Sequence, residues 1–218
     1  MSSASRVIAV IPAFNEAKTI AAVVRGLRAH VAEVIVVDDH SSDATGEEAR
    51  RAGAVVLRNS ANLGYDGSLN AGFAEAAHRG ADIILTFDAD GEHDATDVPR
   101  LVAPIAEGRA DIVAGQRPRT TAFAETLFAL YTRLRYGIAD PLCGLKAYRR
   151  SVYDAVGQFD TVQSIGTELM IKGLQKKFRL ALLPIVLHRR VDDSSRFYAR
   201  RLRANLKILR AAWRVMLA

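Results

Sequence analysis

The sequence contains a single cysteine, Cys143, among its 218 residues. One thiol excludes a disulfide framework and any zinc site built from cysteine pairs. No stretch holds the ~18 uninterrupted apolar residues that a membrane-spanning helix requires. The apolar run near the start stops at Pro12 and meets charged residues, so it is too short and wrongly flanked for a signal peptide. We therefore expect a cytoplasmic protein that is soluble or peripheral at a membrane.

Several nucleotide-binding signatures are also missing. The residues IPAFNE at 11–16 follow the first predicted strand, where a dinucleotide-binding protein would carry G-x-G-x-x-G. There is no P-loop, which argues against an ATPase or kinase of that class. No basic segment with interleaved aromatic residues forms a nucleic-acid-binding module. We expect no nucleic acid partner.

The net charge of +6 hides an uneven distribution. Residues 1–110 contain 10 Lys and Arg against 16 Asp and Glu, whereas residues 111–218 contain 20 against 8. The first half is suited to holding cations and the second to holding anions, unless both are simply solvated surfaces.

Short runs rich in Val and Ile alternate with amphipathic segments through the first 115 residues. The runs predict strands buried on both faces of a sheet, at Val7–Pro12, Val34–Asp38, Ala54–Leu57, Ile83–Asp88 and Asp111–Gly115. The segments between them predict helices at Ala17–His30, Asp43–Ala52, Gly67–Arg79 and Thr96–Glu107. This alternation indicates an α/β fold with a doubly wound, mostly parallel sheet.

The pattern is less regular after Gly115. We expect helices at Phe123–Tyr136 and Val162–Gln175, a short extended piece at Cys143–Tyr148 and a strand at Arg179–Leu187. The last stretch, Tyr198–Ala218, predicts a basic amphipathic helix. Such a helix suits an anionic membrane surface, or it packs on the domain.

Carboxylates gather where predicted strands end. Asp38 and Asp39 end the second strand, and Asp88 and Asp90 end the fourth. Ligands bind at the carboxyl ends of strands in an open parallel sheet, and carboxylates packed there repel one another unless a cation is bound. Hard oxygen ligands indicate Mg²⁺ or Mn²⁺ rather than zinc. The alternative is a set of solvated strand ends.

Seven segments occur in an order that matches a known family. They are IPAFNE at 11–16, VVDDHSSD at 36–43, NLGYDGSLNAGF at 62–73, DADGEH at 88–93, GQR at 115–117, DPLCGLKAY at 140–148 and RVDDSSR at 190–196. From about Val7 to Arg196 the chain resembles family 2 glycosyltransferases of the GT-A fold, in the dolichol- or polyprenyl-phosphate mannosyltransferase branch. The resemblance implies one catalytic domain at 1–197, with a nucleotide-binding half at 1–115 and an acceptor half at 116–197. The amphipathic helix at 198–218 would follow it.

The resemblance implies roles for individual residues around a nucleotide-sugar donor. Asp38 and Asp39 would hold the base and ribose, and Asp88 and Asp90 would form the D-x-D element that binds the metal. Glu92 stands where this branch usually carries Gln, and it would join the metal shell. The remaining nucleotide-pocket residues would be Pro12, Asn15, Glu16, Asn62, Gly64 and Gly67.

The basic half would supply the groups that face phosphate. Arg117 and Arg190 would act on the donor diphosphate or the acceptor phosphate, assisted by Ser195 and Arg196. Arginine suits this role because its planar guanidinium binds phosphate bidentately and stays charged. Glu168 is available as a general base for a hydroxyl acceptor, or it lies on a polar helix face.

These residues imply an inverting, metal-dependent transfer of a hexose, with mannose from GDP-mannose as the expected donor, to a polyprenyl phosphate. The first alternative is the same fold acting on a saccharide or other hydroxyl acceptor, for example from UDP-glucose, with Glu168 as base. The second is a nucleotide-sugar-binding protein without turnover. A lipid acceptor would explain a basic C-terminal helix at a membrane surface, alone or with a membrane-protein partner.

Overall fold

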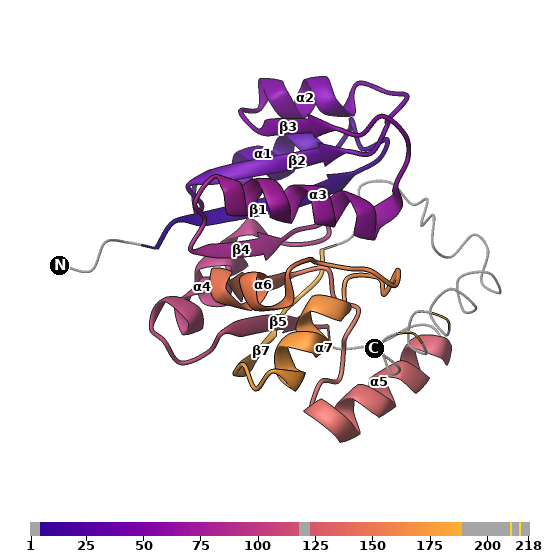
Figure 1. Cartoon of the computed structure of the whole chain (residues 1–218). Coiled ribbons are helices and arrows are strands. Elements are labelled where there is room, and N and C mark those ends of the chain that lie inside the picture. Colours follow the sequence, from indigo (N-terminus) through magenta and orange to yellow (C-terminus); the bar gives the residue numbers. More distant parts are fainter. Residues whose placement is uncertain (1–4, 118–122, 189–209, 211–213, 215–218) are drawn as a thin grey trace.

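The computed structural model describes residues 5–117 and 123–188, together with residues 210 and 214. Seven strands form one sheet in the order β3-β2-β1-β4-β6-β5-β7 (Figure 1). Their bounds are β1 (Val7–Ala13), β2 (Glu33–Asp38), β3 (Val55–Arg58), β4 (Ile83–Thr86), β5 (Ile112–Gln116), β6 (Lys146–Arg149) and β7 (Leu180–Pro184). All neighbouring pairs are parallel except those of β6, which runs antiparallel to both β4 and β5. The predicted α/β fold with a mostly parallel sheet is confirmed.

Helices cover both faces of this sheet. Their bounds are α1 (Ile20–Leu27), α2 (Thr45–Arg51), α3 (Gly64–His78), α4 (Val98–Ala106), α5 (Phe123–Tyr136), α6 (Arg150–Val156) and α7 (Glu168–Gln175), with a 3-10 turn η1 (Ala95–Asp97) before α4. Alternate residues of β1 separate two cores, because successive side chains of a strand point to opposite faces. Ala9 and Ile11 pack with α1, α2 and α4, whereas Ile8 and Val10 pack with α3, α6 and α7. The sheet is therefore doubly wound.

One glycine sets how closely α3 approaches the sheet. A Cβ added at Gly72 would lie 2.2 Å from Val10 Cγ1 and 3.1 Å from Val37 Cγ2. No larger residue fits there without moving the backbone, so α3 lies directly on β1 and β2. The loops before α3, which follow the carboxyl ends of β2 and β3, are fixed in consequence.

Two predicted elements end or begin elsewhere in the structure, and one helix was not predicted. The helix expected at Val162–Gln175 begins only at Glu168, because the backbone N–H groups of residues 162–164 bond to the side chain of Asp160 instead. The strand expected to reach Asp88 ends at Thr86. Helix α6 was not predicted, since seven residues give too little helical spacing to be recognised.

The predicted C-terminal helix lies outside the described residues except for Arg210 and Arg214, which are both helical. Arg214 Nη1 donates to the backbone oxygen of Val162 at 3.0 Å and to Gln163 Oε1 at 3.3 Å. Among the described residues, no helix combines the length and the apolar character needed to cross a membrane.

Candidate active site

Two buried carboxylates lie at the carboxyl end of β2. Asp38 is fully buried and accepts bonds from the Ser41 N–H and from Arg58 Nη1, both at 2.9 Å. Asp39 is also buried and accepts from the N–H groups of Leu63 and Gly64, both at 2.8 Å. These two carboxylates therefore order the loops that follow β2 and β3.

The other residues expected at the nucleotide pocket surround the same loops. Asn15 has a φ of 54° and its side-chain oxygen accepts from the Ser42 N–H at 2.8 Å, which ties the turn after β1 to the turn after β2. Asn62 Nδ2 donates to the backbone oxygen of Asp39 at 3.3 Å. Pro12 ends β1 with Ala13, Glu16 follows it, and Gly64 and Gly67 lie in the first turn of α3. The structure thus brings this predicted set together, with Asp38 inside the protein rather than at its surface.

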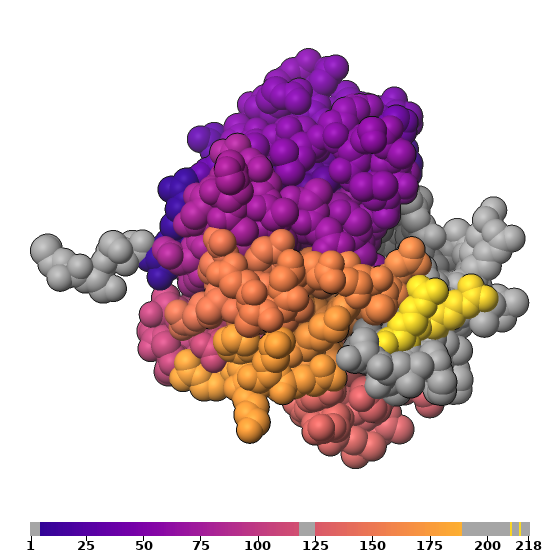
Figure 2. All heavy atoms as spheres, viewed as in Figure 1, coloured from indigo at the N-terminus to yellow at the C-terminus, as the bar shows by residue number. Residues whose placement is uncertain are grey.

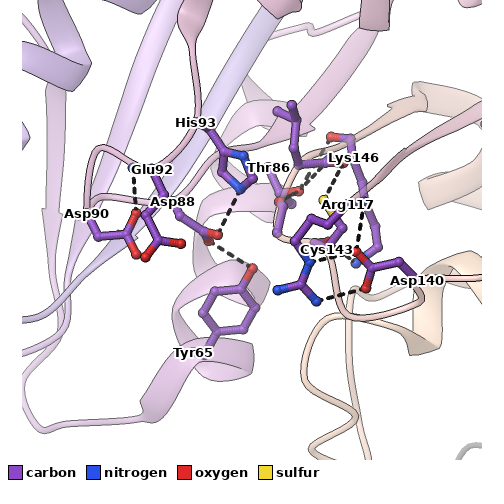
Figure 3. A network of polar contacts seen from close by, with 12 residues as sticks. Tyr65, Thr86, Asp88, Asp90, Glu92, His93, Arg117, Asp140, Cys143 and Lys146 are labelled. Carbon is purple, nitrogen blue, oxygen red and sulfur yellow. Dashed lines mark hydrogen bonds and ion pairs between the residues drawn. The ribbon is translucent and has the colours of Figure 1, made fainter. Parts of the chain in front are cut away.

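Asp88 lies at the centre of a polar network beyond the end of β4 (Figure 3). Its Oδ1 accepts from the Tyr65 hydroxyl at 3.4 Å, and its Oδ2 lies 3.2 Å from His93 Nε2. Burial acts to raise the pKa of Asp88, but the hydrogen bond and charge of His93, with Lys146 and Arg117, lower it below its ordinary value. Asp88 is therefore held as a carboxylate.

Asp90 and Glu92 lie beside Asp88 on the same loop (Figure 3). The Glu92 N–H donates to Asp90 Oδ1 at 3.1 Å, and the Glu92 backbone oxygen accepts from the His188 N–H at 2.8 Å. In their present positions these side chains do not form a group of three metal ligands, nor does any other set among the described residues.

His93, on the same loop, packs into the protein beside Asp88. Its ring is buried, packs edge-on against Phe87 with centroids 5.6 Å apart, and leaves Nδ1 without a partner among the described residues. Burial works to lower the pKa of His93, but Asp88, Asp90 and Glu92 raise it above its ordinary value. These carboxylates therefore favour the protonated form of the His93 ring.

Arg117, at the end of β5, forms a two-point ion pair with Asp140. Its Nε and Nη2 donate to the two carboxylate oxygens at 2.6 and 2.8 Å, and its own N–H adds a third bond to Oδ2 at 3.1 Å. Burial opposes the charge of Arg117, yet the bonds and charge of Asp140 raise its pKa overall. Asp140 itself is held by Gln116, whose Oε1 accepts from the Asp140 N–H at 2.9 Å.

Lys146 is a buried lysine to which the sequence pattern assigned no role. It begins β6, and its Nζ donates to the backbone oxygen of Cys143 at 2.6 Å. Burial lowers the pKa of Lys146 below its ordinary value, and the nearby charges of Asp140 and Asp88 offset this only in part. A charged residue inside a predicted extended segment is the signal that would have identified it.

Cys143 has the inert character expected of a buried thiol. It is fully buried and free, and burial raises its pKa to about 12. It is therefore a neutral thiol, which does not ligate metal.

Glu168 occupies a structural position rather than an open one. Its side chain accepts bonds from the N–H and hydroxyl of Thr161 and the N–H of Val162, and it pairs with Lys172. Burial acts to raise the pKa of Glu168, but Lys172 and Thr161 lower it below its ordinary value. Its oxygens hold the 160–167 loop against the start of α7.

That loop also carries an unusual backbone conformation. Gln163 and Ile165 have φ angles of 58° and 56°, values that cost a β-branched residue free energy. Asp66 of α3 accepts from the N–H groups of Ile165 and Gly166 at 3.2 and 2.7 Å. Asp66 therefore fixes the 160–167 loop. The predicted site residues Arg190, Ser195 and Arg196 lie outside the described residues.

Comparison with known proteins decides the family. A sequence model described as "Glycosyl transferase family 2" matches residues 8–157. The chain belongs to glycosyl transferase family 2. It is therefore a transferase enzyme, and the resemblance read from its motifs is confirmed.

Three relatives illustrate the match. The undecaprenyl-phosphate mannosyltransferase of Micrococcus luteus is 32% identical over 180 residues, which cover 74% of this chain and 73% of that protein. The UDP-N-acetylglucosamine–dolichyl-phosphate N-acetylglucosaminyltransferase of Methanococcus voltae is 28% identical, with 81% and 83% covered. Glucosyl-3-phosphoglycerate synthase from Mycobacterium tuberculosis, solved with Mn²⁺ and UDP-glucose, superposes with a TM-score of 0.74 at 22% identity, over 96% of this chain and 79% of that one. This last likeness confirms the GT-A fold.

Proposed function

We propose that this family 2 enzyme transfers a hexose from a nucleoside-diphosphate sugar to a polyprenyl phosphate, with inversion at the anomeric carbon. The observation that carries the proposal is the placement of the Asp88–Asp90–Glu92 carboxylates within one polar network with Arg117 and Lys146. Carboxylates suit a donor whose diphosphate arrives with a divalent cation, and buried cations suit a phosphate. Two relatives whose names contain a lipid phosphate acceptor support the same class.

The carboxylate set fits Mg²⁺ or Mn²⁺ by its chemistry. Asp88, Asp90 and Glu92 offer hard oxygen ligands, and the neighbouring Cys143 thiol is neutral. Mg²⁺ is commonly held by one or two protein carboxylates together with substrate phosphates and water, so three preformed ligands are not required. A bound cation would neutralise the charge that develops on the departing nucleoside diphosphate.

The protein's own cations would complete that neutralisation. Asp140 orients Arg117 through Nε and Nη2, and Nη1 would contact a phosphate oxygen. A guanidinium fixed in advance loses little freedom when the substrate binds, which favours the transition state. Arg190, Ser195 and Arg196 remain proposed phosphate contacts, and Asp38 with Asp39 would shape the nucleotide pocket mainly through the loops they order.

The state of Glu168 favours a phosphate acceptor over a hydroxyl acceptor. A prenyl phosphate is already an anion at neutral pH and attacks without a general base, whereas a hydroxyl needs one. Glu168 is buried, has a lowered pKa and is committed to Thr161 and Lys172. We take GDP-mannose as the first donor to test, and a UDP-sugar, of the kind bound by the fold neighbour, as the second.

The test is an extraction assay on the full-length protein. Purified enzyme is incubated with Mg²⁺ or Mn²⁺, polyprenyl phosphate and labelled GDP-mannose, UDP-glucose or UDP-N-acetylglucosamine in parallel, with an EDTA control. We expect label from one donor to enter the organic phase and EDTA to prevent it. Metal-dependent nucleotide binding without extracted label would overturn the lipid phosphate acceptor, and label insensitive to EDTA would overturn the metal requirement.

A further inference from the structure

Helix α5 exposes three leucines along one of its faces. Leu127, Leu130 and Leu134 are 50%, 54% and 81% exposed. The opposite face, which packs against the protein, contains Glu125, Phe128 and Thr132, all buried. Single exposed leucines are common on proteins, but three on one helix face indicate a surface that contacts something apolar.

The charges around the leucines identify what that surface fits. At 100° per residue, the three leucines occupy one stripe, and Arg133 and Arg135 lie on either side of it. Both arginines are exposed, and Glu125, the helix's acidic residue, is on the buried face. An apolar stripe with arginines at its edges is the pattern of a helix lying in the surface of an anionic membrane.

We propose that α5 is a membrane-contact helix, which places Leu127, Leu130 and Leu134 in the apolar layer and Arg133 and Arg135 at the level of anionic lipid head groups. Figures 1 and 2 show α5 at the edge of the molecule. A second copy of the chain fits this face less well. A two-fold contact between α5 helices would bring like arginines together without an opposing carboxylate on the described part of that face.

The helix is connected directly to the candidate active site. Thr132 Oγ1 donates to the backbone oxygen of Ile138 at 2.9 Å, which fixes the turn after α5. Gln116 Oε1 then accepts from the N–H groups of Ala139 and Asp140 at 3.0 and 2.9 Å, and Asp140 orients Arg117. The inference rests on the proposed function in this respect: membrane contact through α5 would bring a lipid phosphate to the cations beside Asp88.

Vesicle flotation of the full-length protein, without donor or acceptor, tests the contact itself. The vesicles are phosphatidylcholine alone or with 30% phosphatidylglycerol. We expect binding to the anionic vesicles, at least about a tenfold loss in the L127Q/L130Q/L134Q variant, and about a tenfold loss in R133Q/R135Q. V186Q, which changes another residue that is 72% exposed, should bind like the wild type. Circular dichroism and thermal unfolding confirm that each variant is folded.

The opposite outcomes are distinct. Absence of wild-type binding to the vesicles would overturn the proposal. Equal binding by the leucine variant would also overturn it, and would assign the membrane contact to another segment such as the C-terminal one. A concentration-dependent dimer in sedimentation that the leucine variant loses would assign the face to a second copy. Sugar transfer to a short, water-soluble prenyl phosphate without vesicles tests the proposed function separately, and the leucine variant should retain it.

Discussion

The Asp88 carboxylate occupies space that exists only because residue 144 is glycine: a Cβ on Gly144 would lie 1.9 Å from Asp88 Oδ2. Gly144 precedes β6, and its backbone oxygen accepts a hydrogen bond from Thr86 Oγ1 at 2.6 Å. This bond holds the Gly144 backbone against the end of β4. The position of the D-x-D element is thus set by a segment more than fifty residues later in the chain.

Gly144→Ala should therefore displace Asp88 and lower sugar transfer by about 100-fold, because a shift near 1 Å in a catalytic group has that effect. The measurement is kcat with the donor identified by extraction, together with thermal unfolding to check the fold. Gly26→Ala in α1 is the matched control, because its added Cβ would lie 3.3 Å from Ala95 Cβ of η1, a much milder contact. Normal activity in Gly144→Ala would show that the placement of Asp88 does not limit the reaction.

The Arg117–Asp140 pair should stabilise the fold as well as orient the guanidinium. Asp140→Asn leaves a largely buried arginine without its charge partner, and we expect a loss of about 3 kcal/mol in the free energy of unfolding. Asp154→Asn removes an exposed partner of Arg150 by the same substitution and should cost under about 0.5 kcal/mol. Urea unfolding compares the two variants, and similar costs would contradict the distinction.

Glu168→Gln separates the two acceptor classes. If the acceptor is a phosphate, kcat should stay within about tenfold of the wild type and its pH profile should keep its shape, because no general base is used. Unfolding free energy should fall by about 1–3 kcal/mol, since the Lys172 ion pair is lost. Thr161→Ala, which removes one donor but keeps the carboxylate, should lower stability alone. If kcat falls by about 1,000-fold or more in Glu168→Gln but not in Thr161→Ala, the acceptor is a hydroxyl.

The Asp111 carboxylate should make the free energy of unfolding depend on pH in the acid range. Hydrogen bonds from Arg179 are the largest influence and, with Arg149, they lower its pKa to about 2 from an ordinary 3.8. Because the folded-state pKa is depressed, the stabilisation is present above about pH 4 and is lost as pH falls toward 2. Asp111→Asn should cost on the order of 1 kcal/mol at pH 7, reduced by solvent around the exposed Arg179, and almost nothing near pH 2. Urea unfolding at pH 7, 4 and 2.5 checks this, and Arg179→Gln should reproduce most of the effect.

The sequence made part of this site predictable for a physical reason. An apolar run followed by acidic residues is recognisable in the chain, so Asp38, Asp39, Asp88 and Asp90 could be placed at strand ends. Lys146 could not, because its approach to them depends on β6 inserting antiparallel between β4 and β5. That pairing brings Lys146 to the end of β4.

The start of α7 illustrates a second limit. The spacing over 162–175 correctly predicted a helix in this segment. The helix starts later than predicted, because side chains bind backbone N–H groups before it. Asp160 and Glu168 accept the N–H groups of residues 161–164, and the loop persists until residue 168. Glu168, expected either as a general base or on a polar helix face, begins α7 as a buried residue and accepts hydrogen bonds from the loop.

Glu92 stands where the branch that the chain resembles usually carries glutamine, and it should set how strongly the enzyme depends on its cation. If its carboxylate joins Asp90 around the metal, Glu92→Gln should raise the Mn²⁺ concentration for half-maximal nucleotide binding several-fold, because one charged ligand becomes neutral. At saturating Mn²⁺, kcat should stay within about threefold of the wild type. Asp90→Asn should be more severe and lower activity by about 100-fold at any Mn²⁺ concentration. Calorimetric titration of nucleotide at several Mn²⁺ concentrations gives the comparison. Equal Mn²⁺ dependence in Glu92→Gln and wild type would place Glu92 outside the metal shell.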